Sequence, residues 1–183
     1  DQAVALATQW VTEAPEQAQA HRWLALALQQ QGNLQGATDS LQRALALAPD
    51  DADLHQQQAG LLLALRQLDA ANAALERSTG LNPNALEAYL MQAHLALARN
   101  ELDEAERLAR LAARVQEGHP EVAAVTGMVA LHRGAVDEAL AQLSTAMRAL
   151  PDDPRVLYAL GFAYLRKDML AFAEQSFRRG LEL

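Results

Sequence analysis

An alanine recurs every 34 residues along this chain, each time in the same local setting. The six alanines are Ala3, Ala37, Ala71, Ala105, Ala139 and Ala173. The spacing is kept without an insertion or a deletion. A period of this length indicates a stack of small supersecondary units, because one such unit cannot bury its apolar face alone. The chain is therefore predicted to be an array and not a domain with one central core.

Other positions keep the same register. A small residue precedes each of the later alanines by twelve positions, at Ala25, Ala59, Ala93, Gly127 and Gly161. An apolar residue stands three positions before those alanines, at Leu34, Leu68, Leu102, Val136 and Leu170. Small side chains at matched positions allow two helices to approach closely, since the interhelical distance depends on the residues at the contact.

Each period is predicted to hold two helices joined by a short turn. Apolar residues at helical spacing mark the first helices, for example over residues 52–65, 88–99 and 156–167. The second helices are expected to end at Ala48, Leu81, Val115 or Leu150, and the prolines Pro15, Pro49, Pro83 and Pro151 follow such ends.

The turn between the two helices has its own residue pattern. Gly32, Asn100 and Gly134 occupy one slot, which suits a left-handed residue that ends a helix. Arg66 and Asp168 stand in the same slot and are poorer choices. Three positions later in the register stand Asp69, Asp103 and Asp137, which we predict to be N-caps of the second helices. Pro120 and Pro154 are expected to open first helices, with His119 or Asp153 before them.

Composition narrows the classes of partner and site. The net charge of −8 disfavours nucleic acid, because binding to phosphates needs a basic face. The chain has no cysteine, which excludes disulfides and thiolate zinc sites. Its mostly apolar stretches are far shorter than the ~20 residues that span a bilayer, so we expect a soluble array without membrane insertion. The sequence does not give its compartment.

The pattern resembles the tetratricopeptide repeat (TPR) family over essentially the whole chain. The first full repeat carries the family's residues at Leu24, Ala25, Leu28, Gly32, Ala37, Leu41, Ala44 and Pro49. The last carries Leu160, Gly161, Tyr164, Ala173, Phe177 and Gly180. The resemblance implies an all-α fold, an α-solenoid of antiparallel helix pairs coiled into a right-handed superhelix.

In this interpretation residues 1–17 hold the second helix of a truncated repeat. Five repeats follow at 18–51, 52–85, 86–119, 120–153 and 154–183, and form one continuous solenoid. Because the chain starts inside a repeat and begins with Asp1, we expect it to be a segment of a longer protein. Its composition, rich in alanine, leucine and glutamine, suggests a bacterial source.

The resemblance also implies a concave groove lined by the first helices. In the last three repeats the predicted lining is a nearly continuous apolar stripe interrupted by a histidine: Leu90, His94, Leu97, Met128, Leu131, Tyr158, Phe162 and Leu165. In the first two repeats it is more polar, with Arg22 and Gln56. A contiguous exposed apolar surface usually marks an interaction site. The alternative is that Leu97, Leu131 and Leu165 belong to the core.

A basic rim is predicted beside this stripe. Its members are Arg99, Arg133, Arg166 and Lys167, near the ends of first helices. Such cations stabilise a helix terminus through the dipole, and the alternative is that they guide an acidic peptide. The family's chaperone-binding members hold a carboxylate with a lysine and an asparagine one turn apart, and no matching pair here has that combination.

No residue pattern supports catalysis, and no cofactor is expected. The position shared by His21 and His55 usually holds an aromatic residue in the family that the chain resembles, so we expect both histidines to pack at a helix interface. Trp10 stands where the other repeats have a small residue. We expect it to fill space near the terminus, and the alternative is that it contacts a partner. His94 and His132 fall on adjacent first helices, but no third histidine or cysteine accompanies them, so we predict no metal site.

These observations predict a non-catalytic scaffold that binds a peptide, a helix or a partner domain in its groove. The alternative is a substrate-recruiting or regulatory array attached to an enzyme, or to a polysaccharide or secretion-assembly domain, outside this segment. A third possibility is self-association through the exposed ends of the solenoid. The identity of the partner is beyond the sequence, because a fold does not fix a function.

Overall fold

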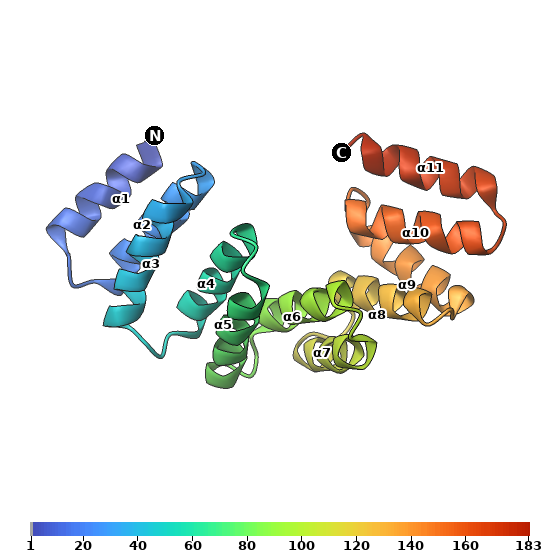
Figure 1. Cartoon of the computed structure of the whole chain (residues 1–183), viewed down its shortest axis with the longest axis horizontal. Helices are drawn as coiled ribbons and strands as arrows, with labels where there is room; N and C mark the ends of the chain where they lie inside the picture. The colour runs from blue at the N-terminus through green and yellow to red at the C-terminus, as the bar shows by residue number, and fades with distance from the viewer. Residues whose placement is uncertain (1) are drawn as a thin grey trace. The chain divides into compact units, whose positions relative to one another are not determined.

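The computed structural model of the chain describes residues 2–183, and all of its regular elements are α-helices (Figure 1). They are α1 (Gln2–Glu13), α2 (Ala18–Gln30), α3 (Leu34–Leu47), α4 (Ala52–Ala64), α5 (Leu68–Leu81), α6 (Leu86–Ala98), α7 (Leu102–Val115), α8 (Pro120–His132), α9 (Val136–Ala149), α10 (Pro154–Arg166) and α11 (Leu170–Leu181). The predicted all-α class, an α-solenoid of helix pairs, is confirmed. The predicted helix bounds differ from the observed ones by at most two residues.

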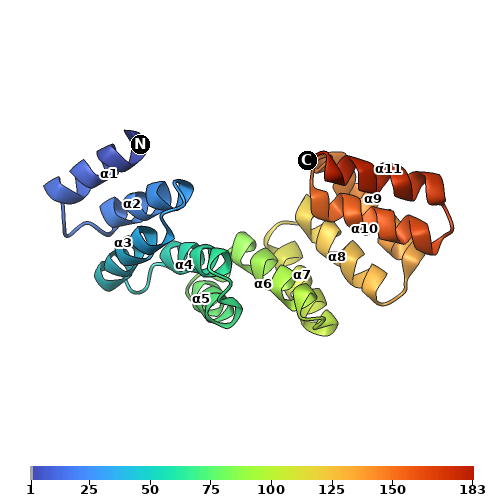
Figure 2. The same ribbon diagram turned by 45° about the horizontal axis from the view of Figure 1, so that its top comes forward.

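The chain divides into two compact units, Asp1–Ala88 and Tyr89–Leu183. In the first unit α2 packs on α3 and α4 on α5, and α1 packs on α2. In the second unit α8 packs on α9 and α10 on α11, and α10 also contacts α8 and α9 (Figure 2). The pairs α2 with α3, α4 with α5, α8 with α9 and α10 with α11 each join the first and second helix of one 34-residue period.

The small residues of the repeat form the contact between paired helices. The alanines Ala37, Ala71, Ala105, Ala139 and Ala173 are at most 1 % exposed, as are Ala25, Ala59 and Ala93. At two positions a glycine lets the side chain of the paired helix lie closer to the backbone than an alanine would. A Cβ atom at Gly127 would lie 2.7 Å from the Leu143 side chain, and one at Gly161 would lie 2.4 Å from the Phe177 ring. The predicted close approach is confirmed at these positions.

The turns inside each repeat have the predicted left-handed residue. Gly32, Asn100 and Gly134 have φ angles of 77°, 60° and 81°. Arg66 and Asp168 take the same conformation at 58°, where a Cβ atom costs roughly 1–2 kcal/mol. In each turn the amide after the left-handed residue donates to a carbonyl five residues back, as Asn33 does to Leu28 at 2.9 Å. This bond closes the first helix in the Schellman manner.

The aspartates Asp69, Asp103 and Asp137 are not N-caps, and that prediction is wrong. The turn is tighter than expected, so α5, α7 and α9 begin one residue before each aspartate. The capping residues are Gln67, Glu101 and Ala135, and none makes a side-chain cap hydrogen bond. The aspartates lie in the first turn, where a negative charge is favourable to the helix dipole.

Pro120 and Pro154 open first helices, as predicted, and the residue before each of them caps its helix. The carboxylate of Asp153 accepts from the amide of Arg155 at 2.8 Å, at the start of α10. The Nδ1 atom of His119 accepts from the amide of Glu121 at 3.3 Å, at the start of α8. Proline occupies the first position of both helices.

Candidate protein-binding surface

The first helices of the second unit carry most of the predicted groove residues, but only part of the predicted stripe is exposed. Leu90, Leu97 and Leu131 are 1 %, 9 % and 7 % exposed, so the prediction of a continuous exposed stripe is wrong at these three positions. Leu131 is buried because α8 packs against α9 and α10, and it belongs to the core that these helices form. Phe162 and Leu165, on α10, are 56 % and 44 % exposed.

The other predicted groove residues are half-buried. In the second unit these are His94 on α6, Met128 on α8 and Tyr158 on α10. In the first unit Arg22 lies on α2 and Gln56 on α4. The guanidinium of Arg22 donates to the carboxylate of Asp53 at 3.5 Å, which links α2 to α4. The two sets belong to different units.

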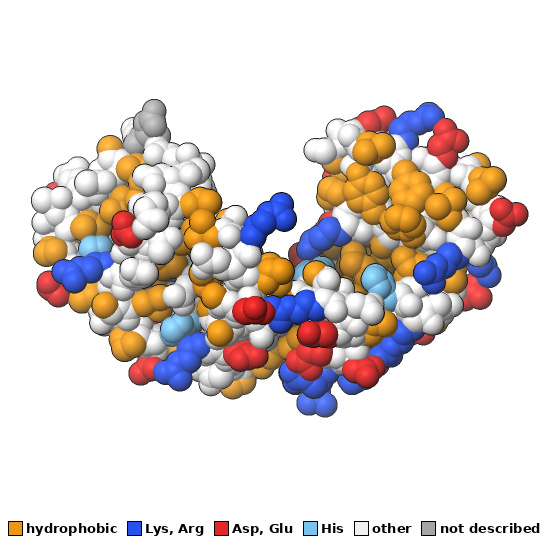
Figure 3. All heavy atoms as spheres, viewed as in Figure 1, with side chains coloured by type: hydrophobic (Ala, Val, Ile, Leu, Met, Phe, Trp, Pro, Cys, Tyr) orange, Lys and Arg blue, Asp and Glu red, His pale blue; other side chains and the backbone are white. Residues whose placement is uncertain are grey.

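An aromatic cluster at α10 and α11 supports the exposed part of the surface. The rings of Phe162 and Phe177 are in edge-to-face contact, with 5.2 Å between the ring centroids and 73° between the planes. Tyr158 lies 6.3 Å from the same Phe177 ring, and its hydroxyl donates to the carbonyl of Gly180 at 3.1 Å. Hydrophobic side chains gather over these two helices in the space-filling view (Figure 3). Phe162 is thus an exposed aromatic ring held in place by a packed neighbour.

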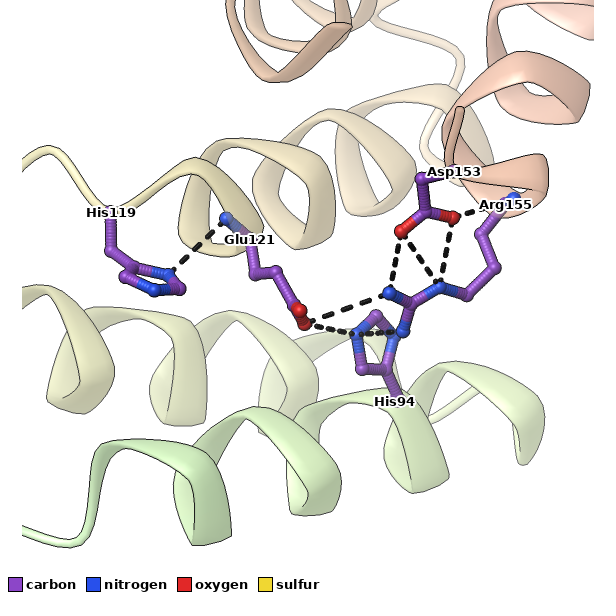
Figure 4. A network of polar contacts seen from close by, with 5 residues as sticks. All are labelled: His94, His119, Glu121, Asp153 and Arg155. Carbon is purple, nitrogen blue, oxygen red and sulfur yellow. Dashed lines mark hydrogen bonds and ion pairs between the residues drawn. The ribbon is translucent and has the colours of Figure 1, made fainter. Parts of the chain in front are cut away.

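A polar network joins three elements of the same unit (Figure 4). Its members are His94 of α6, Glu121 of α8, Asp153 at the N-cap of α10 and Arg155 of α10. Arg155 donates from Nη2 to Asp153 at 2.6 Å and from Nη1 to the Nε2 atom of His94 at 3.0 Å. The Glu121 carboxylate lies 3.7 Å from Arg155 and 3.6 Å from the Nε2 atom of His94.

The geometry fixes the protonation state of His94. A guanidinium can only donate, so the Nε2 atom that receives the Arg155 bond must be an acceptor, and the ring is neutral with its proton on Nδ1. Burial lowers the pKa of His94 below its ordinary value, and the positive charge of Arg155 lowers it further. Glu121 and Asp153 act in the opposite direction without reversing the shift. A protonated ring would have to give up Arg155 and donate to Glu121.

The aspartate of the network remains ionised. Burial alone would raise the pKa of Asp153, but hydrogen bonds from the Arg155 side chain and backbone amide, together with the charge of Arg155, hold it below its ordinary value. The same contacts raise the pKa of Arg155. The network therefore presents one cation, two carboxylates and one neutral imidazole.

The His94 contacts predict that acid destabilises the second unit. The folded state binds the proton less readily than the unfolded chain, whose histidine titrates near 6.5. Stability should therefore fall as the pH drops through about 6.5 and level off below the lower pKa of the folded state. Urea unfolding of the wild type and of His94→Gln between pH 8 and pH 5 gives the free energy of unfolding at each pH. The variant should lose the part of the pH dependence that comes from His94. His132→Gln, at an exposed site on α8, is the control and should keep it.

Sequence reasoning did not identify the network, although one signal was present. Glu121 and Arg155 stand 34 residues apart, in the same register position of successive repeats, and carry opposite charges. Side chains in one register position of adjacent first helices lie next to each other in a stacked array. The pairing of an N-cap aspartate with Arg155 depends on the turn geometry and has no equally simple signal.

The predicted basic rim is largely engaged in contacts between repeats. Arg133 pairs with Asp103 and Glu106 of α7, and the ammonium of Lys167 lies 2.6 Å from Asp137 of α9. The guanidinium of Arg166 donates to the carbonyl of Leu131 at 2.9 Å. Arg99 is half-buried after the end of α6. Three of the four cations thus connect a first helix to the preceding repeat.

The remaining histidines have structural contacts. His21 is buried, and its Nε2 atom lies 2.8 Å from the carbonyl of Pro15. His55 repeats that contact with the carbonyl of Pro49, also at 2.8 Å. Each ring therefore ties a first helix to the proline at the preceding repeat boundary. Over residues 2–183 no three histidines, aspartates or glutamates come together as metal ligands would. None of the helices in that range is long and apolar enough to cross a membrane.

Solved structures share this fold at low sequence identity. PilW, a type IV pilus biogenesis factor, superposes with a TM-score of 0.82 at 16 % identity, covering 96 % of this chain and 81 % of that one. YrrB, described as a TPR protein with an unusual peptide-binding site, gives 0.69 at 19 % identity, with 96 % and 91 % covered. PilF of Pseudomonas aeruginosa gives 0.75 at 17 % identity, with 90 % and 75 % covered. No curated protein sequence matches the chain.

Sequence models of the tetratricopeptide repeat match most of the chain. One matches residues 18–51, and a second matches residues 57–120 and 90–154. These ranges agree with the 34-residue period, with the paired helices and with the small residues at the helix contacts. Proteins of this family are generally interaction scaffolds that bind proteins or peptides. The chain belongs to the tetratricopeptide repeat family.

Proposed function

We propose that the second unit binds a partner protein through the face that its first helices α8 and α10 present. The ligand is an extended peptide or a helix with an apolar side chain that packs on Phe162. The observation that carries the proposal is the exposure of this ring, 56 %, although it is fixed against Phe177. An aromatic ring held in this way loses little conformational freedom when it binds, which is typical of an interaction anchor.

The neighbouring residues complete the proposed surface. Met128 on α8 and Leu165 on α10 add adaptable apolar area in the same two helices. Arg155, at the start of α10, keeps half of its side chain exposed while it is held by Asp153. The exposed part of this cation can attract a carboxylate of the ligand. The surface therefore combines an apolar anchor with a positioned positive charge.

The test is a change of charge at Phe162 with a matched control. Phe162→Asp should weaken the affinity for a partner captured from the source cells and purified by at least tenfold, because it places a carboxylate in the apolar contact. Phe172→Asp makes the same substitution at a site of similar exposure, 51 %, on α11. It should leave the affinity unchanged. Titration calorimetry gives both values, and circular dichroism checks that each variant is folded. Equal affinities of Phe162→Asp and the wild type would reject the proposal.

A further inference from the structure

The polar network of the second unit holds Arg155 at the surface of α10, beside a histidine that can change its charge (Figure 4). Half of the Arg155 side chain is exposed. The side chains of His94, Glu121 and Asp153 are 23 %, 27 % and 12 % exposed. A ligand that lies along α10 therefore has the best access to Arg155, and the other three residues determine the charge around it.

The register shows that Arg155 does not owe its exposure to its place in the last repeat. Glu121 holds the same position in the fourth repeat, and its side chain stays 27 % exposed although α10 packs against α8. Asp53 holds this position in the second repeat, where its side chain is 62 % exposed. The position therefore remains accessible when further helices follow.

Arg155 and Phe162 share one face of α10, since seven residues are close to two turns of helix. They are separated by about 10 Å along the helix axis. An extended chain advances by roughly 3.3–3.6 Å per residue, so two side chains three residues apart span that distance. One extended peptide can therefore place an apolar side chain on Phe162 and a second side chain at Arg155.

The charge of the network depends on His94. With a neutral ring, the positive charge of Arg155 stands against the two negative charges of Glu121 and Asp153, so one negative charge is left over. A protonated ring removes this excess. A carboxylate at Arg155 is therefore held more strongly when His94 is protonated, and by reciprocity the bound carboxylate favours the protonated ring.

Protonation also changes the hydrogen bonds of the network. The Nε2 atom of His94 lies 3.0 Å from Nη1 of Arg155 and 3.6 Å from the carboxylate of Glu121. A proton on Nε2 turns this acceptor into a donor, so the ring releases Nη1 and turns toward Glu121. Arg155 keeps its place, because its Nε and Nη2 atoms remain bonded to Asp153 at 3.1 and 2.6 Å. The released Nη1 group can then donate to a carboxylate of the ligand.

We propose that the second unit binds a ligand carboxylate at Arg155 with uptake of a proton by His94, so that acid strengthens binding; this rests on the function proposed above. The ligand is an extended segment with an acidic side chain three residues from the apolar side chain that packs on Phe162. The charged groups that act on His94 are Glu121 of α8, Asp153 at the start of α10 and Arg155 of α10. Burial and Arg155 favour the neutral ring, whereas the two carboxylates favour the protonated one.

Two blocked peptides test the proposal. One is acetyl-Ser-Asp-Ser-Ser-Leu-Ser-amide, and the other has asparagine in place of aspartate. Both are also made in reversed order, and the direction that binds more tightly is used. The aspartate peptide should bind about three to ten times more tightly at pH 5.5 than at pH 7.5, the effect of one added charge near the surface. The asparagine peptide should bind equally at both pH values.

The ring of His94 gives a direct readout by nuclear magnetic resonance. The resonance of its Cε1 proton is identified by its loss in His94→Gln. A saturating concentration of the aspartate peptide should move the midpoint of its titration to higher pH, because the bound carboxylate stabilises the protonated ring. The asparagine peptide should leave the midpoint unchanged.

Variants separate the parts of the network. His94→Gln should remove the pH dependence of binding, whereas His132→Gln, at an exposed site on α8, should keep it. Arg155→Gln should bind the aspartate and asparagine peptides alike. Glu121→Gln removes one negative charge, as protonation of His94 does, and should bind the aspartate peptide about three to ten times more tightly than the wild type at pH 7.5. Glu138→Gln is the matched control, at an exposed site on α9, and should have no effect.

Three results would overturn the proposal. The first is an aspartate peptide whose affinity is the same at both pH values, and the second is a His94 midpoint that this peptide does not move. The third is no binding of either peptide at millimolar concentration, because one ligand then does not join the two sites. The function proposed above is decided separately, by the affinity of Phe162→Asp for the captured partner. If both peptides bind equally and Phe162→Asp weakens both, the apolar anchor stands and the carboxylate site is rejected.

Discussion

Leu143→Ala should lower the free energy of unfolding of the second unit by about 2–5 kcal/mol, the usual cost of a cavity at a fully buried leucine. Leu143 has no exposed surface and lies in the core formed by α8, α9 and α10. Leu170→Ala is the matched control, since Leu170 is 62 % exposed on α11. It should change stability by less than about 0.5 kcal/mol. Urea unfolding followed by circular dichroism gives both values.

The contact between Leu143 and Gly127 makes this prediction sharper. A Cβ atom at Gly127 would lie 2.7 Å from the Leu143 side chain, so Gly127→Ala alone should destabilise by about 1–3 kcal/mol. Leu143→Ala removes the two side-chain atoms that this Cβ atom would meet and leaves only the backbone nitrogen of residue 143, at 3.1 Å, so Gly127→Ala should then cost less than it does in the wild type. The double variant should therefore be more stable than the sum of the two single losses predicts. Additive losses would show that the glycine is not placed by this leucine.

A pair of glycine substitutions is the second large effect, and the two should have opposite signs. In Gly161→Ala the new Cβ atom would lie 2.4 Å from the Phe177 ring, which also packs on Tyr158 and Phe162. Displacing that ring should lower the free energy of unfolding by about 1–3 kcal/mol, despite the better helix propensity of alanine. Gly60 lies inside α4, and nothing stands within 4 Å of its added Cβ atom. Gly60→Ala should raise stability by about 0.5–1 kcal/mol.

Thermal unfolding of the two glycine variants beside the wild type decides this prediction. If both raise the midpoint, Phe177 can move freely, and the close contact does not hold the helices together. Because Phe177 also supports Phe162, Gly161→Ala should in addition weaken the proposed partner binding, whereas Gly60→Ala should not. That second measurement links the packing of the last repeat to its proposed function.

The sequence predicts the local part of this structure well, because a repeat imposes the same short-range rules many times. The left-handed residues at Gly32, Asn100 and Gly134 and the helix starts at Pro120 and Pro154 follow from a few neighbouring residues. The aspartate caps failed because the observed N-caps, Gln67, Glu101 and Ala135, lie two residues earlier than the pattern suggests. The His94 network joins residues up to 61 positions apart, and it also depends on side-chain conformations that a period does not encode.

The 34-residue period, the helix pairs and the small residues at which they meet can be predicted from the sequence, since they depend on neighbours along the chain and on matched positions in the next repeat. Which apolar residues of one register face solvent depends on how the helices pack. Leu131 and Leu165 are the same residue in the same register, yet Leu131 is 7 % exposed and Leu165 is 44 % exposed. The two leucines differ because α10 packs against α8, whereas within residues 2–183 no further first helix follows α10.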